Sequence, residues 1–395
     1  MIPKKSCIFA PAFGKSAFVR VQKHAGCCAV GSASGLGPGG RTFESCHPDM
    51  KKHILLIFLF FSVSAWTLAA PKSGHYVNLD GKSGKTLFDQ VSTIANKGFK
   101  TLGYNGLWTA YASTDTDENG YIIDMYGGCS FKLYTKQCGT YKDECDCYNR
   151  EHSIPQSWWG KGTSGIGCDI FHIVPTDGKV NGMRGNHPFG EVANHKNASY
   201  SYNGNYLGTS STEFGKSMTV FEPKDEYKGD FARGYMGAMI KWQHSNMKQS
   251  QGGEMFTCNY TSTGGYGFTQ YSIKLLMKWH REDPVSDKER KRNDGIEKTQ
   301  GNRNPFIDYP YLAEFFWGEK KDQTLDFDHL VCAYDDDFEQ YPNGWKEEDP
   351  SDIDVIYAQP ADEPCFDCGN KVIIDGKIYI RQGEHLYNIM GVVVQ

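Results

Sequence analysis

A carboxylate and an imidazole stand side by side at Glu151 and His152, and Pro155 follows three residues later. Proline cannot continue a helix interior or a central strand, so it favours the end of an element here. A second polar run begins seventeen residues after His152 and carries Asp169, His172, Asp177, Asn181 and Arg184. The two runs supply a base, carboxylates, an amide and a guanidinium within 36 residues. This set of groups suits metal-assisted cleavage of a phosphodiester.

The pair alone does not decide a function. Either residue of such a pair is more often a surface group or a satisfied buried group than a catalyst. Neighbouring side chains on a regular strand point to opposite faces, so Glu151 and His152 converge only where a strand ends or bulges. Pro155 favours such an ending, and the second run adds the remaining groups.

Several segments show the apolar spacing of helices that bury one face. Leu87, Val91 and Ile94 recur at helical spacing, for example. Ser286 and Glu289 have the spacing of a capping box, in which each side chain satisfies a free backbone N–H of the other residue. Helices are predicted over 85–97, 228–242 and 271–280, and from Ser286 onward.

Strands are predicted in two places. Residues 119–134 contain short β-branched and aromatic runs broken by glycine. Residues 371–381 alternate around Asp375-Gly376, which is the typical turn of a two-residue hairpin, and a further strand is expected through 386–394. The stretch 194–215 is rich in Ser, Asn, Gly and Tyr and is interpreted as a surface loop or ribbon.

Residues 50–70 have the three parts of a secretory signal peptide. Met50 opens a short basic start, 54–66 is a 13-residue apolar run, and Leu68-Ala69-Ala70 ends the segment in small residues. The run is shorter than the roughly 20 residues that cross a bilayer. We therefore expect an exported product without a stable membrane span, which is secreted, periplasmic or carried at the cell surface.

A signal peptide is read at an N-terminus, and here 49 residues precede it. The favoured interpretation is that synthesis starts at Met50 and that 1–49 is a mis-assigned upstream extension. A genuine disordered extension is the alternative.

Export to an oxidising compartment favours disulfides. Nine cysteines follow the signal peptide, and those from Cys129 to Cys168 cluster around Glu151 and His152. Their pairing cannot be deduced, and the odd number leaves at least one thiol unpaired within the chain. Cys365 and Cys368 could form half of a zinc site, but no second half accompanies them, so a local disulfide or free thiols are favoured.

The formal net charge of −5 is unevenly distributed. Residues 319–363 hold 3 basic and 15 acidic residues, whereas 71–318 hold 28 basic and 27 acidic residues. The acidity therefore belongs to a tail, which is interpreted as a linker between a catalytic domain (71–318) and a C-terminal β-hairpin segment (364–395). A near-neutral domain can still carry a basic groove.

Four separated motifs resemble the bacterial endonuclease I family of secreted, non-specific nucleases. They are EHSIPQSW at 151–158, DIFHIVPTDGKVNGMRGN at 169–186, FEPKDEYKGDFAR at 221–233, and WHREDPVSDKERKRN with QGNRNPFID within 279–308. The likeness covers about residues 77–318. It implies an α+β fold, a mixed α/β nuclease domain that contains a ββα-metal finger, also called a His-Me finger. The C-terminal segment would be a small β module, and it resembles sorting segments of some exported proteins.

The resemblance also implies roles for individual residues. His152 matches the general base at the end of the first strand, Glu151 the metal-binding carboxylate, and Asn181 the second metal ligand, on a short helix that Thr176 would cap. Some relatives carry an arginine that holds the cleaved phosphate between the two motifs, but here only Lys161 is cationic in that segment. The substitutes are Arg184 as a catalytic residue, and Arg233, Arg303 and Lys161 as substrate-binding residues.

The sequence thus predicts a secreted, metal-dependent endonuclease that hydrolyses DNA, with RNA as a second substrate, without sequence specificity. His152 would activate water, and Mg²⁺, with Mn²⁺ or Ca²⁺ as alternatives, would stabilise the phosphorane and the leaving 3′ oxygen, giving 5′-phosphate ends.

Two other interpretations stay open. The same ligands could serve a phosphodiesterase that acts on small nucleotides. The 23 tyrosines and 8 tryptophans also suit a non-enzymatic extracellular protein that binds carbohydrate or a surface. The sequence fixes no oligomeric state, and a monomer is the simplest expectation.

Overall fold

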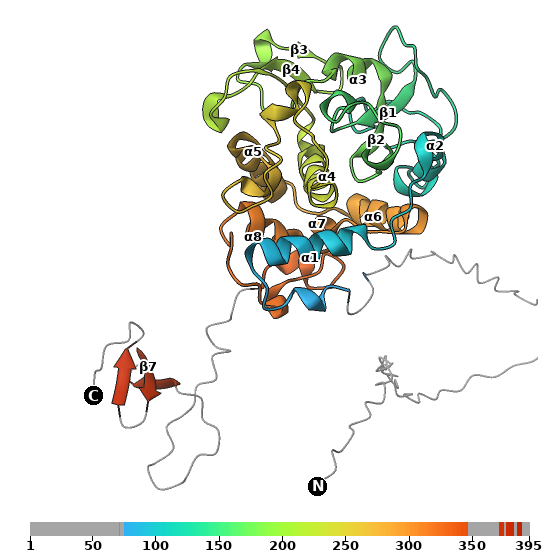
Figure 1. The fold of residues 1–395 in the computed structure, drawn as a ribbon. Helices are drawn as coiled ribbons and strands as arrows, with labels where there is room; N and C mark the ends of the chain where they lie inside the picture. Colours follow the sequence, from blue (N-terminus) through green and yellow to red (C-terminus); the bar gives the residue numbers. More distant parts are fainter. Residues whose placement is uncertain (1–70, 72–74, 347–370, 375–376, 383–384, 389–395) are drawn as a thin grey trace, which may run out of the picture. The chain divides into compact units, whose positions relative to one another are not determined.

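The structure is a computed structural model that describes residues 71, 75–346, 371–374, 377–382 and 385–388 (Figure 1). The predicted signal peptide, residues 1–49, Cys365 and Cys368 lie outside these residues. Among the residues described, no helix is both long and apolar enough to cross a membrane.

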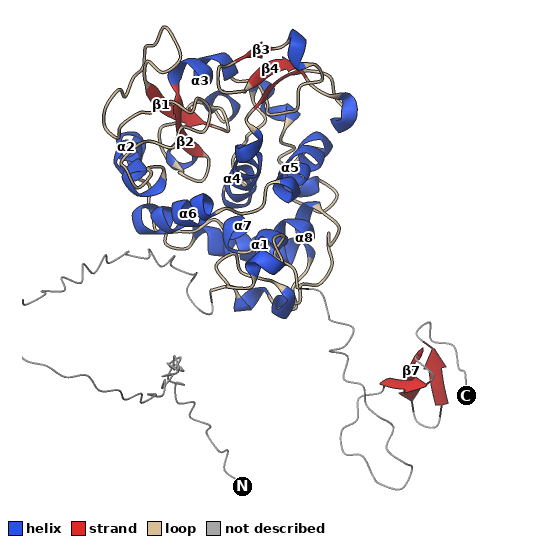
Figure 2. Ribbon diagram, turned by 180° about the vertical axis from the view of Figure 1, so that it is seen from behind, coloured by secondary structure: helices blue, strands red, loops and turns tan. Residues whose placement is uncertain are grey.

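Helices and short strands combine in an α+β fold (Figure 2). The helices are α1 (Gly84–Asn96), α2 (Gly103–Thr114), α3 (Gly178–Arg184), α4 (Lys228–Lys241), α5 (Gln270–Glu282), α6 (Asp287–Gln300), α7 (Pro305–Asp308) and α8 (Glu314–Trp317). The strands are β1 (Tyr148–His152), β2 (Ile173–Asp177), β3 (Ser199–Tyr200), β4 (Tyr206–Thr209), β5 (Thr219–Glu222), β6 (Lys371–Ile374), β7 (Lys377–Gln382) and β8 (His385–Asn388).

The core surrounds α4, whose residues are buried almost without exception, and α1, α5 and α7 pack against it. Gly234 lets α4 approach the chain just before β2, because a Cβ at this position would lie 2.9 Å from the Phe171 carbonyl oxygen. The predicted helices α1, α4 and α5 are confirmed. The capping box of α6 is confirmed too, since Ser286 and Glu289 each accept from the backbone N–H of the other.

The prediction of strands in 119–134 is wrong. This segment makes only isolated bridges, from Ile122 to Thr116 and from Tyr121 to Lys132. The buried Asp124 carboxylate accepts from the backbone N–H groups of Tyr126, Gly127 and Cys129. A side chain therefore takes the donors that a strand ladder would use.

The prediction of a linker from 319 is corrected for its first part. Val331, Ala333 and Phe338 are buried in one cluster with Val285 of the α5–α6 turn and Ile307 of α7. The folded domain thus continues past residue 318 to at least 346, because a few apolar side chains anchor an otherwise acidic segment. Residues 347–363 are outside the part of the chain that the structure describes.

Two further sheets are antiparallel. The ribbon predicted in 194–215 is present as β3 and β4, which β5 extends to three strands. β6, β7 and β8 form the second sheet, and Ile374 pairs with Lys377, as the predicted two-residue turn requires.

Candidate active site

The two polar motifs meet in one strand–strand–helix unit (Figure 1). β1 and β2 are antiparallel, with Glu151 opposite Val174 and His152 opposite Ile173. α3 follows β2 without an intervening loop. Residues 151, 152, 181 and 184 therefore belong to three adjacent elements, although up to 33 residues separate them along the chain.

α3 is anchored where β2 ends. Asp177 Oδ1 accepts from the backbone N–H groups of Lys179 (2.8 Å) and Val180 (2.9 Å), and Oδ2 accepts from that of Cys145 (2.7 Å). Asp177, and not Thr176, is therefore the N-cap of α3. A carboxylate that accepts from two N–H groups at a helix start also complements the helix dipole.

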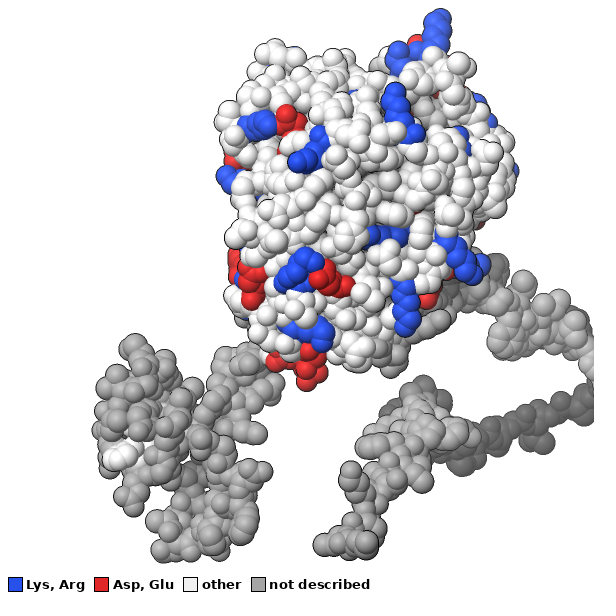
Figure 3. Space-filling model, viewed as in Figure 1, with Lys and Arg blue, Asp and Glu red and all other residues white. Residues whose placement is uncertain are grey.

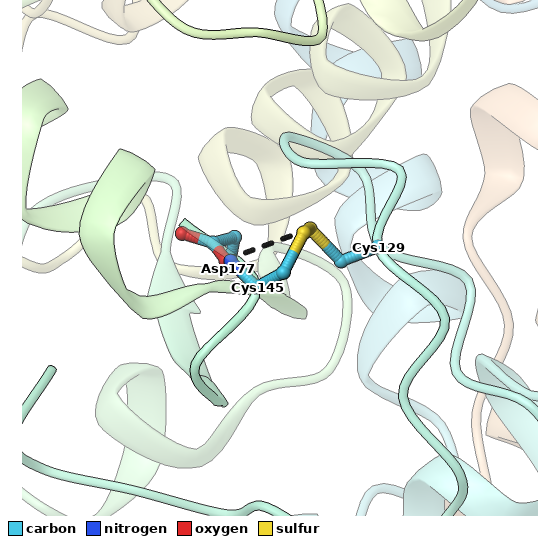
Figure 4. Close-up of side chains that lie close together, drawn as sticks. All are labelled: Cys129, Cys145 and Asp177. Atoms are coloured by element: carbon cyan, nitrogen blue, oxygen red, sulfur yellow. Dashed lines mark hydrogen bonds between the residues drawn. A yellow bond between two sulfur atoms is a disulfide. The ribbon is translucent and has the colours of Figure 1, made fainter. Parts of the chain in front are cut away.

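Asp177 also lies beside the sulfurs of Cys129 and Cys145 (Figure 4). The three groups are close enough to surround a cation, but the sulfurs are joined in a disulfide and supply no thiolate. This cluster is therefore a structural brace that ties the 124–147 segment to the start of α3. Cys138 and Cys147 form a second disulfide nearby, which confirms the prediction of disulfides around Glu151 and His152.

Side chains of β1 alternate between two neighbours. Asn149 and Glu151 contact residues of α3, and we call this the α3 face of β1. Arg150 and His152 contact Tyr104 of α2, and we call this the α2 face. The alternation is the normal pleat of a strand. Adjacent residues Glu151 and His152 are thus held by different helices.

Glu151 is buried on the α3 face. Its Oε1 accepts from the Tyr126 hydroxyl (2.9 Å) and from Arg184 Nη1. Oε2 accepts no hydrogen bond from any residue that the structure describes. Burial raises the pKa of Glu151, and the Arg184 charge and the Tyr126 hydrogen bond oppose that rise. One carboxylate oxygen is thus fixed, and the other keeps its capacity for a ligand.

Asn181 is held in the same way. Its Nδ2 donates to Asn149 Oδ1 at 2.7 Å, and its own Oδ1 makes no hydrogen bond within the described residues. Because Asn149 is two residues before Glu151 on one strand face, the Asn181 amide and the Glu151 carboxylate are on the same side of β1. Two oxygens of the kinds that hard cations prefer are available on this face.

Arg184 is fully buried, and within the described part of the chain it donates to five protein oxygens. Besides Glu151, Nη1 contacts the His152 carbonyl oxygen (3.0 Å) and Nη2 the Ser153 carbonyl oxygen (2.6 Å). The guanidinium therefore holds Glu151 and the end of β1 in place. In this position it does not face the solvent from which a substrate would enter.

On the α2 face, the His152 ring lies between aromatic side chains. Tyr104 stacks on it at 5.8 Å between ring centroids, and Trp159 lies at 5.9 Å. His152 Nε2 lies 3.2 Å from the Gly167 carbonyl oxygen and 3.2 Å from Gln156 Nε2. Burial and the neighbouring His172 lower the pKa of His152 to about 3, so its imidazole is neutral near pH 7.

Two of the other predicted cations are bound to internal carboxylates. Arg233 binds both carboxylate oxygens of Glu289 at 2.6 Å, and Arg303 binds Asp308, and both arginines are buried. Neither guanidinium is accessible to a phosphate in this arrangement, which argues against their expected role in substrate binding. Lys161 is exposed, and its backbone N–H donates to the Gln156 carbonyl oxygen.

Basic side chains do not gather on the face shown in Figure 3. Over the described residues drawn there, Lys and Arg are spread singly, and Asp and Glu lie among them. The near-neutral charge predicted for the domain thus appears as a mixed surface on this side.

Sequence reasoning missed the residues that hold the predicted ones in place. The period of two along a strand could have joined Asn149 to Glu151 and Arg150 to His152. No sequence signal points to Tyr126, which is 25 residues away from the carboxylate it binds.

A family model and three known proteins match this chain. The model of the family named Endonuclease I matches residues 83–311. An extracellular ribonuclease of Bacillus amyloliquefaciens is 34% identical over 64% of this chain and 80% of its own length. One of Bacillus subtilis (strain 168) is 33% identical over 64% of the chain and 84% of its own length. A periplasmic deoxyribonuclease of Aeromonas hydrophila is 26% identical over 47% of this chain and 77% of its own length. The chain, with its paired strands and capped helix around Glu151 and Asn181, belongs to the endonuclease I family and is a hydrolase of nucleic acid phosphodiester bonds.

Proposed function

We propose that this protein is an exported endonuclease that cleaves both RNA and DNA without sequence specificity and leaves 5′-phosphate ends. The names of the relatives, two extracellular ribonucleases and a periplasmic deoxyribonuclease, support both substrates and a secreted or periplasmic location. The strand–strand–helix unit formed by β1, β2 and α3 supports the ββα-metal finger that the sequence predicts.

The observation that carries the proposal is the pair of available oxygens on the α3 face. Glu151 Oε2 and Asn181 Oδ1 would hold Mg²⁺, because the other polar atoms of both side chains are already bound by Arg184, Tyr126 and Asn149. With only two protein ligands, a bound Mg²⁺ would keep several waters and supply positive charge to the phosphate under attack and to the leaving 3′ oxygen.

His152 would act as the general base on the other face of β1. Its imidazole is neutral near pH 7, which is the form that accepts a proton from water. A phosphate placed near the ring would raise its pKa, since an anion stabilises the imidazolium. Because Glu151 and His152 leave the strand on different sides, the substrate would lie across the end of β1.

The test is cleavage by the full chain of a supercoiled plasmid and of single-stranded RNA, with Mg²⁺ and with EDTA. We expect cleavage of both only with the metal. We expect a loss of at least a hundredfold in kcat for His152→Ala, in line with removal of a general base. His244→Ala is the matched control, because His244 is exposed in the loop after α4. Unchanged cleavage by His152→Ala would remove His152 from the mechanism.

The same samples separate the rival functions. A phosphodiesterase for small nucleotides would hydrolyse bis-nitrophenyl phosphate but spare long nucleic acids. A carbohydrate-binding protein would cleave neither substrate.

A further inference from the structure

Arg150 differs from the other arginines whose side chains the structure describes. The structure describes seven arginine side chains including Arg150, and the other six each form an ion pair with a carboxylate. A guanidinium that is partly withdrawn from water without a counter-ion costs free energy, so the fold normally supplies a carboxylate. Arg150 is half-buried next to the proposed active site, and none of the described carboxylates forms an ion pair with it.

The surroundings of Arg150 fix its direction without neutralising its charge. Nη1 donates to the Tyr104 carbonyl oxygen at 2.6 Å. The guanidinium carbon lies 3.5 Å from the Tyr104 ring centroid and 4.5 Å from that of Trp108, both on α2. Aromatic faces attract a guanidinium but do not use its N–H donors. Of its five donors, one is bonded within the described residues.

Arg150 also shares its surroundings with His152. The two residues are on the α2 face of β1, and the Tyr104 ring that contacts the guanidinium also stacks on the His152 ring. A phosphate within reach of His152 would therefore lie beside a positive charge that has donors to spare. Planar guanidinium donors match the oxygens of a phosphate.

We propose that Arg150, held by Tyr104 and Trp108, binds a backbone phosphate of the substrate strand on the His152 side of β1. This proposal rests on the proposed function. It gives the α2 face a phosphate subsite, whereas the α3 face provides the oxygens for a cation. Arg150 takes the place that Arg233 and Arg303 cannot take, because their guanidinium groups are buried against carboxylates.

The experiment is binding of a fluorescein-labelled single-stranded oligonucleotide to the full chain in EDTA, followed by fluorescence anisotropy at several salt concentrations. Arg150→Met keeps a long side chain against Tyr104 and Trp108 but removes the charge. We expect Kd to rise about tenfold or more, and the slope of log K against log salt to fall by about 0.7, the contribution of one contact to a single-strand phosphate.

Arg150→Lys is the second variant. It keeps the charge and loses the planar donors, so we expect an unchanged salt slope with a smaller rise in Kd. Lys97→Ala is the matched control, because Lys97 is exposed at the end of α1, makes no ion pair among the described residues, and should leave Kd and slope unchanged.

Two outcomes would overturn the proposal. If Arg150→Met binds like the wild type and only its urea midpoint falls, Arg150 serves the packing of α2 on β1 alone. If Arg150→Lys loses as much of the salt slope as Arg150→Met, the effect is one of folding and not of charge. Binding in EDTA is independent of turnover, so a wild type that fails to cleave would refute the proposed function without affecting this result.

Discussion

Arg233→Met is expected to destabilise the fold and to leave substrate affinity unchanged. Arg233 has no exposed surface, and its Nε and Nη2 bind the two carboxylate oxygens of Glu289 at 2.6 Å. Its Nη1 donates to the Asp283 carbonyl oxygen at 2.8 Å, which joins α4 to the turn between α5 and α6. Its contacts with described residues are internal, although the sequence offered it as a substitute for the phosphate-binding arginine that some relatives carry.

The size of the effect follows from what the substitution leaves behind. Methionine fills much of the volume of the arginine side chain, but Glu289 remains buried without its counter-ion. Removing one partner of a buried pair costs about 3–5 kcal/mol, which is a large part of the 5–15 kcal/mol that stabilises an ordinary domain. Burial already raises the pKa of Glu289, and loss of Arg233, which lowers it, would raise it further.

The assay is urea unfolding of the full chain, followed by tryptophan fluorescence, together with KM for RNA below the unfolding transition. The control is Arg233→Met combined with Glu289→Gln, which removes the stranded charge while glutamine can still accept from Ser286 in the capping box. We expect the double variant to recover most of the lost stability. A raised KM with an unchanged urea midpoint in Arg233→Met would refute the structural role and restore Arg233 as a substrate contact.

Three further predictions concern stability. Burial, with Arg233 nearby, lowers the pKa of His280 from 6.5 to about 3. Below pH 6.5 the unfolded chain binds a proton at His280 that the folded protein does not bind, so the free energy of unfolding falls as the pH falls towards 3. The loss is about 2 kcal/mol at pH 5. The shift of the urea midpoint between pH 7 and pH 5 should therefore be smaller in His280→Gln. Replacing Cys129 and Cys145 together by Ser should cost about 3 kcal/mol in urea unfolding, because their disulfide closes a loop of 16 residues, and dithiothreitol should then have a smaller effect than in the wild type. Asp177→Ala should cost about 1 kcal/mol in the same assay and lower kcat by loosening α3, whereas Asp177→Asn keeps a good N-cap and should retain most of both.

The sequence predicted the parts of the fold that depend on local patterns. Apolar spacing located α1, α4 and α5, and a three-residue spacing located the cap of α6. The prediction of strands in 119–134 failed, because backbone N–H groups of this segment donate to the buried Asp124 carboxylate in a turn and not to a neighbouring strand. A β-branched run predicts a strand only if its backbone N–H groups are free to pair with another strand. Whether a nearby side chain accepts from those N–H groups instead depends on the tertiary structure.

Site residues that belong to a motif could be predicted from the sequence. The roles of arginines that are buried or exposed by the tertiary fold could not be predicted in this way. Glu151 and Asn181 lie on one side of β1, as a shared metal site would require. Arg233 and Arg303 have the same charge as a phosphate-binding arginine, but their partners are 56 and 5 residues away in the sequence. An internal ion pair and a substrate contact look alike until the accessible surface is known.

The two faces of β1 show how adjacent residues can take different parts in one reaction. On the α3 face, Arg184 and Asn149 each occupy one polar atom of a proposed metal ligand, so the direction of the remaining oxygen is set before any cation binds. On the α2 face, Tyr104 contacts both the proposed base and Arg150, which forms no ion pair with a described residue. A phosphodiester at the end of the strand would have a cation site on one side, and a base and a guanidinium on the other. The strand pleat, which argued at first against a Glu-His pair acting together, is then what keeps the negative charge of Glu151 away from the phosphate-binding side.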